Sequence, residues 1–383
     1  MLKYLKILCL AVVVSAFEIR TASVCADEPP LVVKKSADPE ISSRLRALVE
    51  KYKLPGIVGG IVHGGDLIAV GVSGVRKFDS PELMTVNDKM HLGSCTKAMT
   101  ATRIAMLVEE GKLDWGSTLA SVFPDEMDSA HPDFHDVTLS QLLTHRAGLP
   151  ANIFWDLLNN KLSITEKRRA VLRIALKRAP HSKPGTEFRY SNVGYVLAGA
   201  MAEKVAGQSW EELIQGGLFQ SLEMSSAGFG PPGLKGAVDQ PWGHRSLLGH
   251  LVPLQEDNSP AIGPAGTVHA SLPDWAKFAA LHLQGARGEA KLLRHETFLR
   301  MQTPPESANY AMGWVSESPE WTKSPGFWHN GSNTMWYSLV WILPRRNLAL
   351  LVATNRFDEP AQNACNEAVR SLLDYFETVL WKN

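Results

Sequence analysis

The sequence predicts a mixed α/β (α+β) fold, in which one antiparallel sheet is built from both ends of the chain and is flanked by helices. Strand-like apolar runs lie near residues 56–77 and 334–355, and helical spacing dominates between them. The 383 residues, 45% of them hydrophobic, are enough for one large domain or two closely packed parts. We expect an α/β part of about 38–115 and 262–383, with an inserted, mainly helical part of about 116–261.

The first residues have the order of a secretory signal peptide. Two lysines precede an apolar run from Ile7 to Phe17, and small residues ending at Ala26 precede an acidic stretch. An uncleaved anchor is the alternative, but this run falls short of the roughly 20 apolar residues that span a bilayer. The sequence therefore predicts cleavage after Ala26, with Ala16 as the second choice. Residues 1–26 would be removed, and residues 27–383 would be exported to the periplasm or the medium as a single domain without a stable membrane span.

Charge and cysteine content exclude several kinds of partner. The 39 basic residues balance the 39 acidic ones, so the cationic surplus typical of nucleic-acid binding is missing, and no nucleic-acid partner is expected. Cys9 and Cys25 would leave with the signal, and the spacing of Cys95 and Cys365 fits neither a zinc site nor a disulfide framework. The two histidines of HPDFH (131–135) lack a third ligand, so neither a metal nor another cofactor is predicted.

Local signals predict the N-terminal elements. Asp38 stands as the N-cap and Pro39 at the first position of a helix with its apolar residues on one side. Two β-runs within 56–77 are joined by the turn Gly64–Asp66, which predicts a hairpin. A second, amphipathic helix is expected to begin at Ser94.

Spacing predicts the later elements. Three stretches have helical spacing: 137–145, 165–179 and 192–207. Between 228 and 266, Pro and Gly are frequent and no period is clear, which predicts a long loop that is either a functional rim or disordered. The C-terminal part is expected to contain a short helix, two strands joined by a turn, and a closing helix: 272–283, 334–344, 348–355 and about 359–381.

Ser94 and Lys97 form the one S-x-x-K pair of the sequence. Three residues apart on a helix, they share a face, and the helix start favours developing negative charge at Ser94. A serine needs a base to act as a nucleophile, and a desolvated, neutral lysine can be that base. The plain alternative is that Ser94 only caps the helix and Lys97 reaches solvent.

Tyr190 and Asn192 lie two residues apart at the mouth of an apolar helix. A tyrosine can relay a proton, and an amide can orient Lys97 or hold a substrate carbonyl. The plain alternative is that Asn192 caps the helix that follows, which is compatible with such a role. Residues 307–309 have a similar S-x-N form but lie too close to the C-terminal strands to be preferred.

His329 and Gly331 precede a long β-run. A glycine there would let a substrate backbone approach the strand edge. The pattern H-x-G alone is weak, because it also occurs at His63 and His91. The position of His329 after the other two motifs and before a strand favours it.

In this order, SCTK (94–97), YSN (190–192) and HNG (329–331) resemble the motifs of the serine β-lactamase and penicillin-binding protein superfamily. The likeness is greatest to its branch of class C β-lactamases, D-alanyl-D-alanine carboxypeptidases and esterases. The stretches LLTHRAGLP, GPAGTVHAS and YAMGWV are similar too, so the resemblance covers nearly all of the mature chain. It implies a β-lactamase/transpeptidase-like fold and an exported serine hydrolase that acts through an acyl-serine intermediate on an ester, amide or β-lactam.

The resemblance also implies a role for each residue. Ser94 would be the acylated nucleophile, Lys97 the general base and Tyr190 its partner in proton transfer. Asn192 would orient the site, and His329 would fill the strand position that lysine often holds. The residues implied to bind substrate, or to complete an oxyanion hole with the Ser94 amide, are Asn330, Gly331 and Ser332.

The third motif departs from the lysine-threonine-glycine pattern at its first two positions, His329 and Asn330. A permanent charge is exchanged for a group that is largely neutral near pH 7, which weakens the expectation of a substrate carboxylate. The substrate is expected to be a small molecule or a peptide, cell-wall fragments included. The alternative is a catalytically silent receptor or scaffold for such fragments. An α/β-hydrolase would need G-x-S-x-G, and the segment 71–75 lacks the last glycine.

Overall fold

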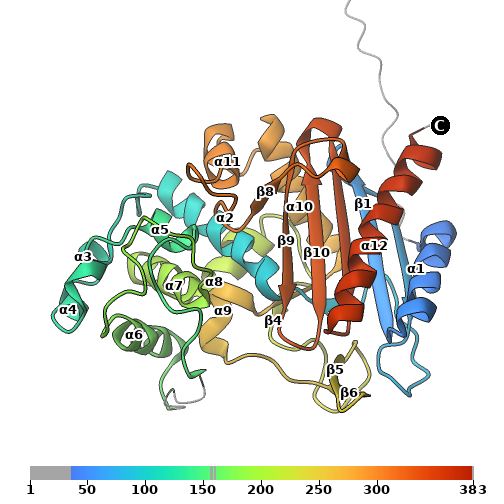
Figure 1. The fold of residues 1–383 in the computed structure, drawn as a ribbon, viewed down its shortest axis with the longest axis horizontal. Helices are drawn as coiled ribbons and strands as arrows, with labels where there is room; N and C mark the ends of the chain where they lie inside the picture. Colours follow the sequence, from blue (N-terminus) through green and yellow to red (C-terminus); the bar gives the residue numbers. More distant parts are fainter. Residues whose placement is uncertain (1–35, 156–157, 159–160, 382–383) are drawn as a thin grey trace, which may run out of the picture. The chain divides into compact units, whose positions relative to one another are not determined.

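The main sheet of the molecule joins strands from both ends of the chain. A computed structural model describes residues 36–155, 158 and 161–381, so the expected signal peptide lies outside the described residues. The strands of the main sheet are β1 (Gly56–His63), β2 (Asp66–Gly74), β8 (Val315–Glu317), β9 (Gly326–Ser332), β10 (Tyr337–Leu343) and β11 (Leu348–Thr354). They follow the order β2-β1-β11-β10-β9-β8, and the paired strands are antiparallel (Figure 1). This arrangement confirms the predicted fold class.

Helices cover both faces of this sheet. The helices concerned are α1 (Pro39–Tyr52), α12 (Glu359–Tyr375) and α10 (Leu272–Arg287). Strand side chains alternate between faces, so Ile57 and Ile61 of β1 pack in the core beneath α1 and α12, while Val58 and Val62 belong to the core shared with α10. In the described part of the chain no helix is long and apolar enough to cross a membrane.

The N-terminal elements form as their local signals predict. The Asp38 side chain caps α1 by accepting hydrogen bonds from the backbone N–H groups of Glu40 and Ile41, at 3.0 and 3.1 Å. The strands β1 and β2 form the expected hairpin across Gly64 and Gly65, both of which have positive φ. Each of these predictions depends on residues close in sequence, so contacts with distant parts of the chain do not alter the predicted element.

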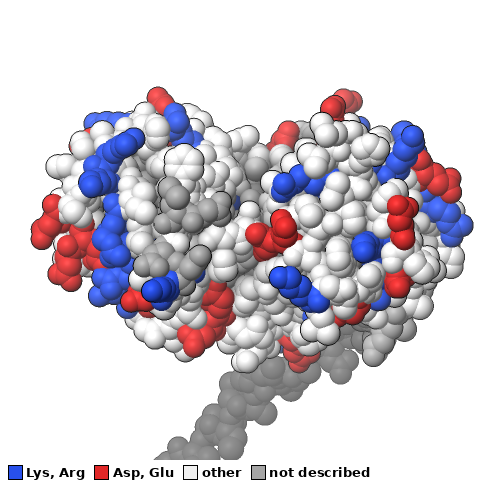
Figure 2. All heavy atoms as spheres, turned by 90° about the horizontal axis from the view of Figure 1, so that it is seen from below, with Lys and Arg blue, Asp and Glu red and all other residues white. Residues whose placement is uncertain are grey.

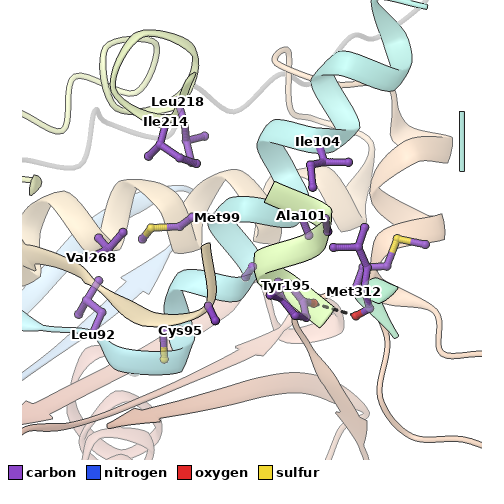
Figure 3. Close-up of a cluster of buried hydrophobic side chains, with 14 of the residues drawn as sticks. Leu92, Cys95, Met99, Ala101, Ile104, Tyr195, Ile214, Leu218, Val268 and Met312 are labelled. Atoms are coloured by element: carbon purple, nitrogen blue, oxygen red, sulfur yellow. Dashed lines mark hydrogen bonds between the residues drawn. The ribbon is translucent and has the colours of Figure 1, made fainter. Parts of the chain in front are cut away.

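A mainly helical part is inserted between the two groups of strands, on the left in Figure 1. Its helices are α3 (Leu119–Val122), α4 (Pro124–Met127), α5 (Leu139–Leu143), α6 (Ile164–Ala175), α7 (Asn192–Ala206) and α8 (Trp210–Ile214). The helix α2 (Thr96–Glu109) packs against α7 and α8 of this part and is buried nearly all round, whereas the sequence predicts an amphipathic helix. Figure 3 shows Leu92, Cys95 and Val268 beside its first turn and Ile104 farther along.

One prediction about the strands is confirmed and one needs correction. His329 and Gly331 precede the strand β10, as predicted, and they lie within β9, in agreement with the strand position that the resemblance implies for His329. The stretch 228–266 is not one long loop, since it contains β4 (Gly228–Phe229), the hairpin of β5 (Gly243–Leu247) and β6 (His250–Leu254), and α9 (Gly263–Gly266). The sequence did not predict this hairpin, because β6 contains a proline and its side chains do not alternate between buried and exposed. The remaining strands and α-helices of the described residues are β3 (Lys89–His91), β7 (Val268–Ser271) and α11 (His295–Gln302), with β7 between β3 and β4.

A buried arginine ties the helical part together. Arg168 of α6 has no exposed surface, and its guanidinium forms ion pairs with Glu203 of α7 and Glu211 of α8. It also donates to the backbone carbonyls of Pro260 and Ala261, at 3.1 and 3.2 Å. Arginine suits this position because its planar fork can satisfy several acceptors at once.

We predict that Arg168→Met lowers the free energy of unfolding by about 3–5 kcal/mol, because it leaves Glu203 buried without its partner. Urea unfolding followed by circular dichroism measures this change. Arg173→Met, an exposed position on the same helix, is the matched control and should stay near wild type. Equal stabilities of the two variants would contradict the structural role of Arg168.

Candidate active site

Ser94 lies in a short 3-10 turn, Gly93–Cys95, which leads directly into α2. Its side chain caps neither element, so the plain alternative of a capping serine is wrong. Gly93 has φ +49°, and a Cβ built on it would lie 2.2 Å from the backbone nitrogen of Ser332. Only glycine allows this close packing of the turn on β9.

Lys97 is fully buried and points back at the serine. Its Nζ lies 3.0 Å from Ser94 Oγ, and it donates to Asn192 Oδ1 and to the backbone carbonyl of Ala265, both at 2.7 Å. Its exposed fraction is 0%, so the alternative in which it reaches solvent is also wrong. All three of these partners are uncharged.

Burial lowers the pKa of Lys97 well below its ordinary value, because desolvation penalises the ammonium form. A neutral amine has two N–H bonds and one lone pair. The carbonyl oxygens of Asn192 and Ala265 can only accept, so they take the two N–H bonds. The lone pair is then left for the hydroxyl of Ser94.

Tyr190 approaches the same serine from the helical part. Its hydroxyl donates to Ser94 Oγ at 2.7 Å, and Lys97 Nζ lies 4.8 Å from the centre of its ring. The residue is 37% exposed. Desolvation of the hydroxyl raises the pKa of Tyr190, so the group is a phenol at neutral pH. Lys97, and not Tyr190, is therefore the group poised as a base.

Asn192 holds Lys97 in place. Its Nδ2 donates to Asn152 Oδ1 at 2.9 Å, which turns its own carbonyl oxygen towards the lysine. The predicted capping role is wrong, since Ser191 caps α7 by accepting from the backbone of Gly194 at 3.0 Å. Because its neighbour does the capping, the Asn192 side chain is free to face the cluster.

The structure places His329 beside the cluster but not in contact with Ser94. It is 3% exposed; its Nδ1 contacts the carbonyl of Asn330, and its Nε2 lies 3.0 Å from Tyr310 Oη. A carbonyl can only accept, so the ring proton is on Nδ1 and the hydroxyl of Tyr310 donates to Nε2. Burial, together with the nearby Lys97, lowers the pKa of His329 to about 3. The strand position that lysine often holds is therefore uncharged.

The other residues of the third motif lie on different sides of β9. Gly331 faces the turn Gly93–Cys95, and a Cβ on it would lie 2.6 Å from the Ser94 nitrogen. Asn330 faces the opposite side of the sheet, where its Nδ2 donates to the hydroxyl of Tyr337 at 2.9 Å, so its side chain is not part of the cluster. The Ser332 side chain accepts from the backbone of Thr334 at 2.8 Å, and its backbone nitrogen packs against Gly93.

Several residues at the site were missed by sequence reasoning. Asn152 orients Asn192, Tyr310 binds His329, and the carbonyl of Ala265 binds Lys97. The His145 ring packs 4.4 Å from that of Tyr190. Three of these residues lie in or next to stretches whose likeness to the superfamily was noted: LLTHRAGLP, GPAGTVHAS and YAMGWV. That likeness was the available signal, although it assigned none of them a contact.

Known proteins resemble this chain over most of its length. A family model described as Beta-lactamase matches residues 41–374, which is most of the chain. The chain belongs to the beta-lactamase family. The match includes the SCTK, YSN and HNG motifs, so the resemblance on which the predicted fold depends is confirmed.

Relatives within the beta-lactamase family bear different names. Penicillin-binding protein 4 of Amycolatopsis lactamdurans is 25% identical over 332 residues, which cover 82% of this chain and 84% of that protein. The unguisins hydrolase ungD' of Aspergillus campestris is 22% identical over 336 residues, covering 83% of this chain but only 61% of its own length.

Solved structures share the fold. The octameric penicillin-binding protein homologue from Pyrococcus abyssi has a TM-score of 0.72 and 28% identity, covering 88% of this chain and 77% of that one. A class C beta-lactamase from Rhodobacter sphaeroides has a TM-score of 0.70 and 20% identity, covering 87% and 99%. The second likeness concerns the fold alone.

The buried amine gives a prediction about stability. Between the lowered pKa of Lys97 and its ordinary value, the unfolded chain binds more protons than the folded one, so stability rises with pH. This contribution reaches at most about 1.4 kcal/mol per pH unit. We expect Lys97→Met to remove it. The unfolding free energy of wild type minus that of the variant should therefore become more positive as the pH rises towards 10.5, the ordinary pKa of lysine.

Urea titrations at each pH measure this difference. Lys291→Met, at an exposed position, is the control and should keep the slope of the wild type. A constant difference between wild type and Lys97→Met across this range would show that Lys97 is not held neutral by burial.

Proposed function

We propose that the chain is a serine hydrolase that forms an acyl intermediate on Ser94. One observation carries this proposal: Ser94 Oγ lies between the buried amine of Lys97, at 3.0 Å, and the hydroxyl of Tyr190, at 2.7 Å. A nucleophile hydrogen-bonded to its base, with that base oriented by a third group, is the arrangement that nucleophilic catalysis needs. Asn192 is the orienting group.

In the first step, Ser94 Oγ attacks the carbonyl carbon of the substrate and its proton passes to the lone pair of Lys97 Nζ. A neutral base is required for this transfer, and burial supplies it. The bond between the carbonyl carbon and the leaving group then breaks. Net proton transfer runs from Ser94 through Lys97 and Tyr190 to the leaving group, and water later hydrolyses the ester to Ser94.

Negative charge develops on the carbonyl oxygen during the attack. The backbone N–H groups of Ser94 and Ser332 are the proposed donors, since the turn of Ser94 and the end of β9 pack backbone to backbone. One such donor is worth about 3 kcal/mol in the transition state. β8 pairs only with residues 326–328 of β9, so no strand of the described chain pairs with this side of His329–Ser332. We propose this segment as the place where an extended substrate lies.

The uncharged third motif limits the substrate class. His329 is neutral and bound to Tyr310, so it offers no cation to a carboxylate. We therefore favour an ester or amide that is uncharged next to the scissile bond over a penicillin. The name of the relative ungD', a hydrolase, supports hydrolysis. Acidic and basic side chains are interspersed over the face in Figure 2, which is indented between the helical part and the sheet part.

The test is the intact mass of the chain after incubation with a short-chain p-nitrophenyl ester and, separately, with a penicillin. We expect ester turnover and an acyl adduct that Ser94→Ala abolishes. The control variant is Ser307→Ala, which should behave as wild type. Ser307 is exposed and belongs to the other segment of S-x-N form, 307–309.

Each other outcome has a distinct meaning. An adduct that persists in Ser94→Ala would refute the proposed nucleophile. A lasting penicillin adduct would contradict the uncharged substrate and favour a penicillin-binding role. Binding of cell-wall fragments without turnover of any ester, amide or lactam would support the silent receptor instead.

We also propose that the protein is exported after removal of residues 1–26. The support is the order of the sequence: basic residues, an apolar run and small residues ending at Ala26. Expression of the full chain in a secreting bacterium should yield a periplasmic or extracellular protein whose N-terminus is Asp27. A matched Ala26→Arg variant should be processed elsewhere or retained, because cleavage requires a small residue there. An intact N-terminus on the cytoplasmic protein would overturn this proposal.

A further inference from the structure

A buried histidine and aspartate lie directly behind the nucleophile turn. His91 ends β3 and has no exposed surface. The backbone N–H of Gly93 donates to its Nδ1 at 3.1 Å, and its Nε2 lies 2.9 Å from Oδ2 of Asp257, whose side chain is 5% exposed. Neither residue takes part in the proton transfer at Ser94.

The hydrogen bonds determine where the ring proton lies. A backbone N–H can only donate, so Nδ1 of His91 must accept from Gly93. The proton is therefore on Nε2 and is donated to the Asp257 carboxylate. In this tautomer both nitrogens are satisfied, and the ring orientation is fixed from both sides.

Asp257 extends the chain of hydrogen bonds to the other side of the site. Its Oδ1 accepts from the backbone N–H of Asn258 at 2.7 Å and from Nδ2 of Asn333 at 3.0 Å. Asn333 is buried, and its Oδ1 accepts from the backbone N–H groups of Met335 and Trp336, both at 3.2 Å. Asn333 thereby shapes the turn that follows β9.

We propose that His91, Asp257 and Asn333 act as a clamp that sets the separation of the two oxyanion-hole donors. The inference rests on the proposed function of Ser94 and concerns its geometry. One end of the clamp holds Gly93, which precedes Ser94, and the other end is Asn333, which follows Ser332. The three are positioning residues, because they act through the backbone of their neighbours.

A clamp of this kind has a kinetic signature. The oxyanion donors bind charge that exists only in the transition state, so moving them lowers kcat and leaves KM nearly unchanged. A displacement well below an ångström is enough for a measurable loss, because the hydrogen bonds must point at the developing oxyanion.

Three variants break the clamp at different links. In Asp257→Asn the amide oxygen can keep the bonds to Asn258 and Asn333, but the new NH2 group then faces the Nε2–H of His91, so two donors oppose each other. If the ring proton moved to Nδ1 instead, it would face the backbone N–H of Gly93, which is also a donor. His91→Gln can keep a donor for Asp257 but lacks the acceptor for Gly93. His91→Asn can keep that acceptor but loses the link to Asp257.

We expect all three variants to lower kcat for the p-nitrophenyl ester about 10-fold to 100-fold, with KM within about twofold of wild type. The two His91 variants keep the charge of Asp257, so a loss confined to Asp257→Asn would indicate an effect of charge and overturn the clamp. An increase in KM with unchanged kcat would also overturn it.

Another buried histidine provides the control for effects on stability. His282 has no exposed surface and lies 2.9 Å from the hydroxyl of Thr102, away from Ser94. His282→Gln removes a buried histidine of the same kind and should keep kcat within about threefold of wild type. An equal loss of kcat in His282→Gln would show that the His91 variants act only through general stability, and this would overturn the clamp.

A second readout does not require turnover. Amide hydrogen exchange at 92–96 and 331–336 should become faster in each clamp variant, because one link of the chain is lost. Unchanged exchange in both segments would overturn the inference even if the ester is not a substrate. Failure of the proposed function would be recognised differently. The wild type itself would form no adduct at Ser94, while the clamp variants would still show faster amide exchange in both segments.

Discussion

The burial of an amine without a carboxylate beside it is the constraint on which the site depends. Lys97 is fully enclosed, and its Nζ contacts a hydroxyl, an amide oxygen and a backbone carbonyl. Desolvation therefore acts on its pKa without an opposing anion. The helices α7, α8 and α9 pack against α2, and this explains why the helix is buried nearly all round.

The same enclosure demands close backbone contacts, and glycines at three positions permit them. A Cβ on Gly313 would lie 2.6 Å from Cα and N of Ala98, and Gly93 and Gly331 bring the Ser94 turn onto β9 in the same way. The two sides of this contact come from distant parts of the chain. Since β1 and β11 pair in register along their length, the sheet that unites the chain ends also sets the geometry of the site.

Sequence reasoning succeeded where the signal is local. The Asp38 cap, the Gly-Gly turn of the first hairpin and the spacing of Ser94 and Lys97 each involve residues a few positions apart. It failed where partners are distant: Asn152 beside Asn192, Tyr310 beside His329, and Asp257 beside His91 have no periodic signature. The orientation of the Asn330 side chain was not predicted for a related reason. Alternation along β9 decides it, and the spacing of apolar residues predicted no strand over 326–332.

The neutrality of His329 and that of Lys97 are two aspects of one electrostatic arrangement. A permanent cation at position 329 would be repelled by a protonated Lys97 and would lower the pKa of that lysine further. Here burial alone lowers it, and His329 adds no charge because the hydroxyl of Tyr310 occupies its Nε2. The site thus holds a neutral amine without a cation at position 329. This arrangement supports the proposed uncharged ester or amide, because neither Lys97 nor His329 offers a positive charge to a substrate carboxylate.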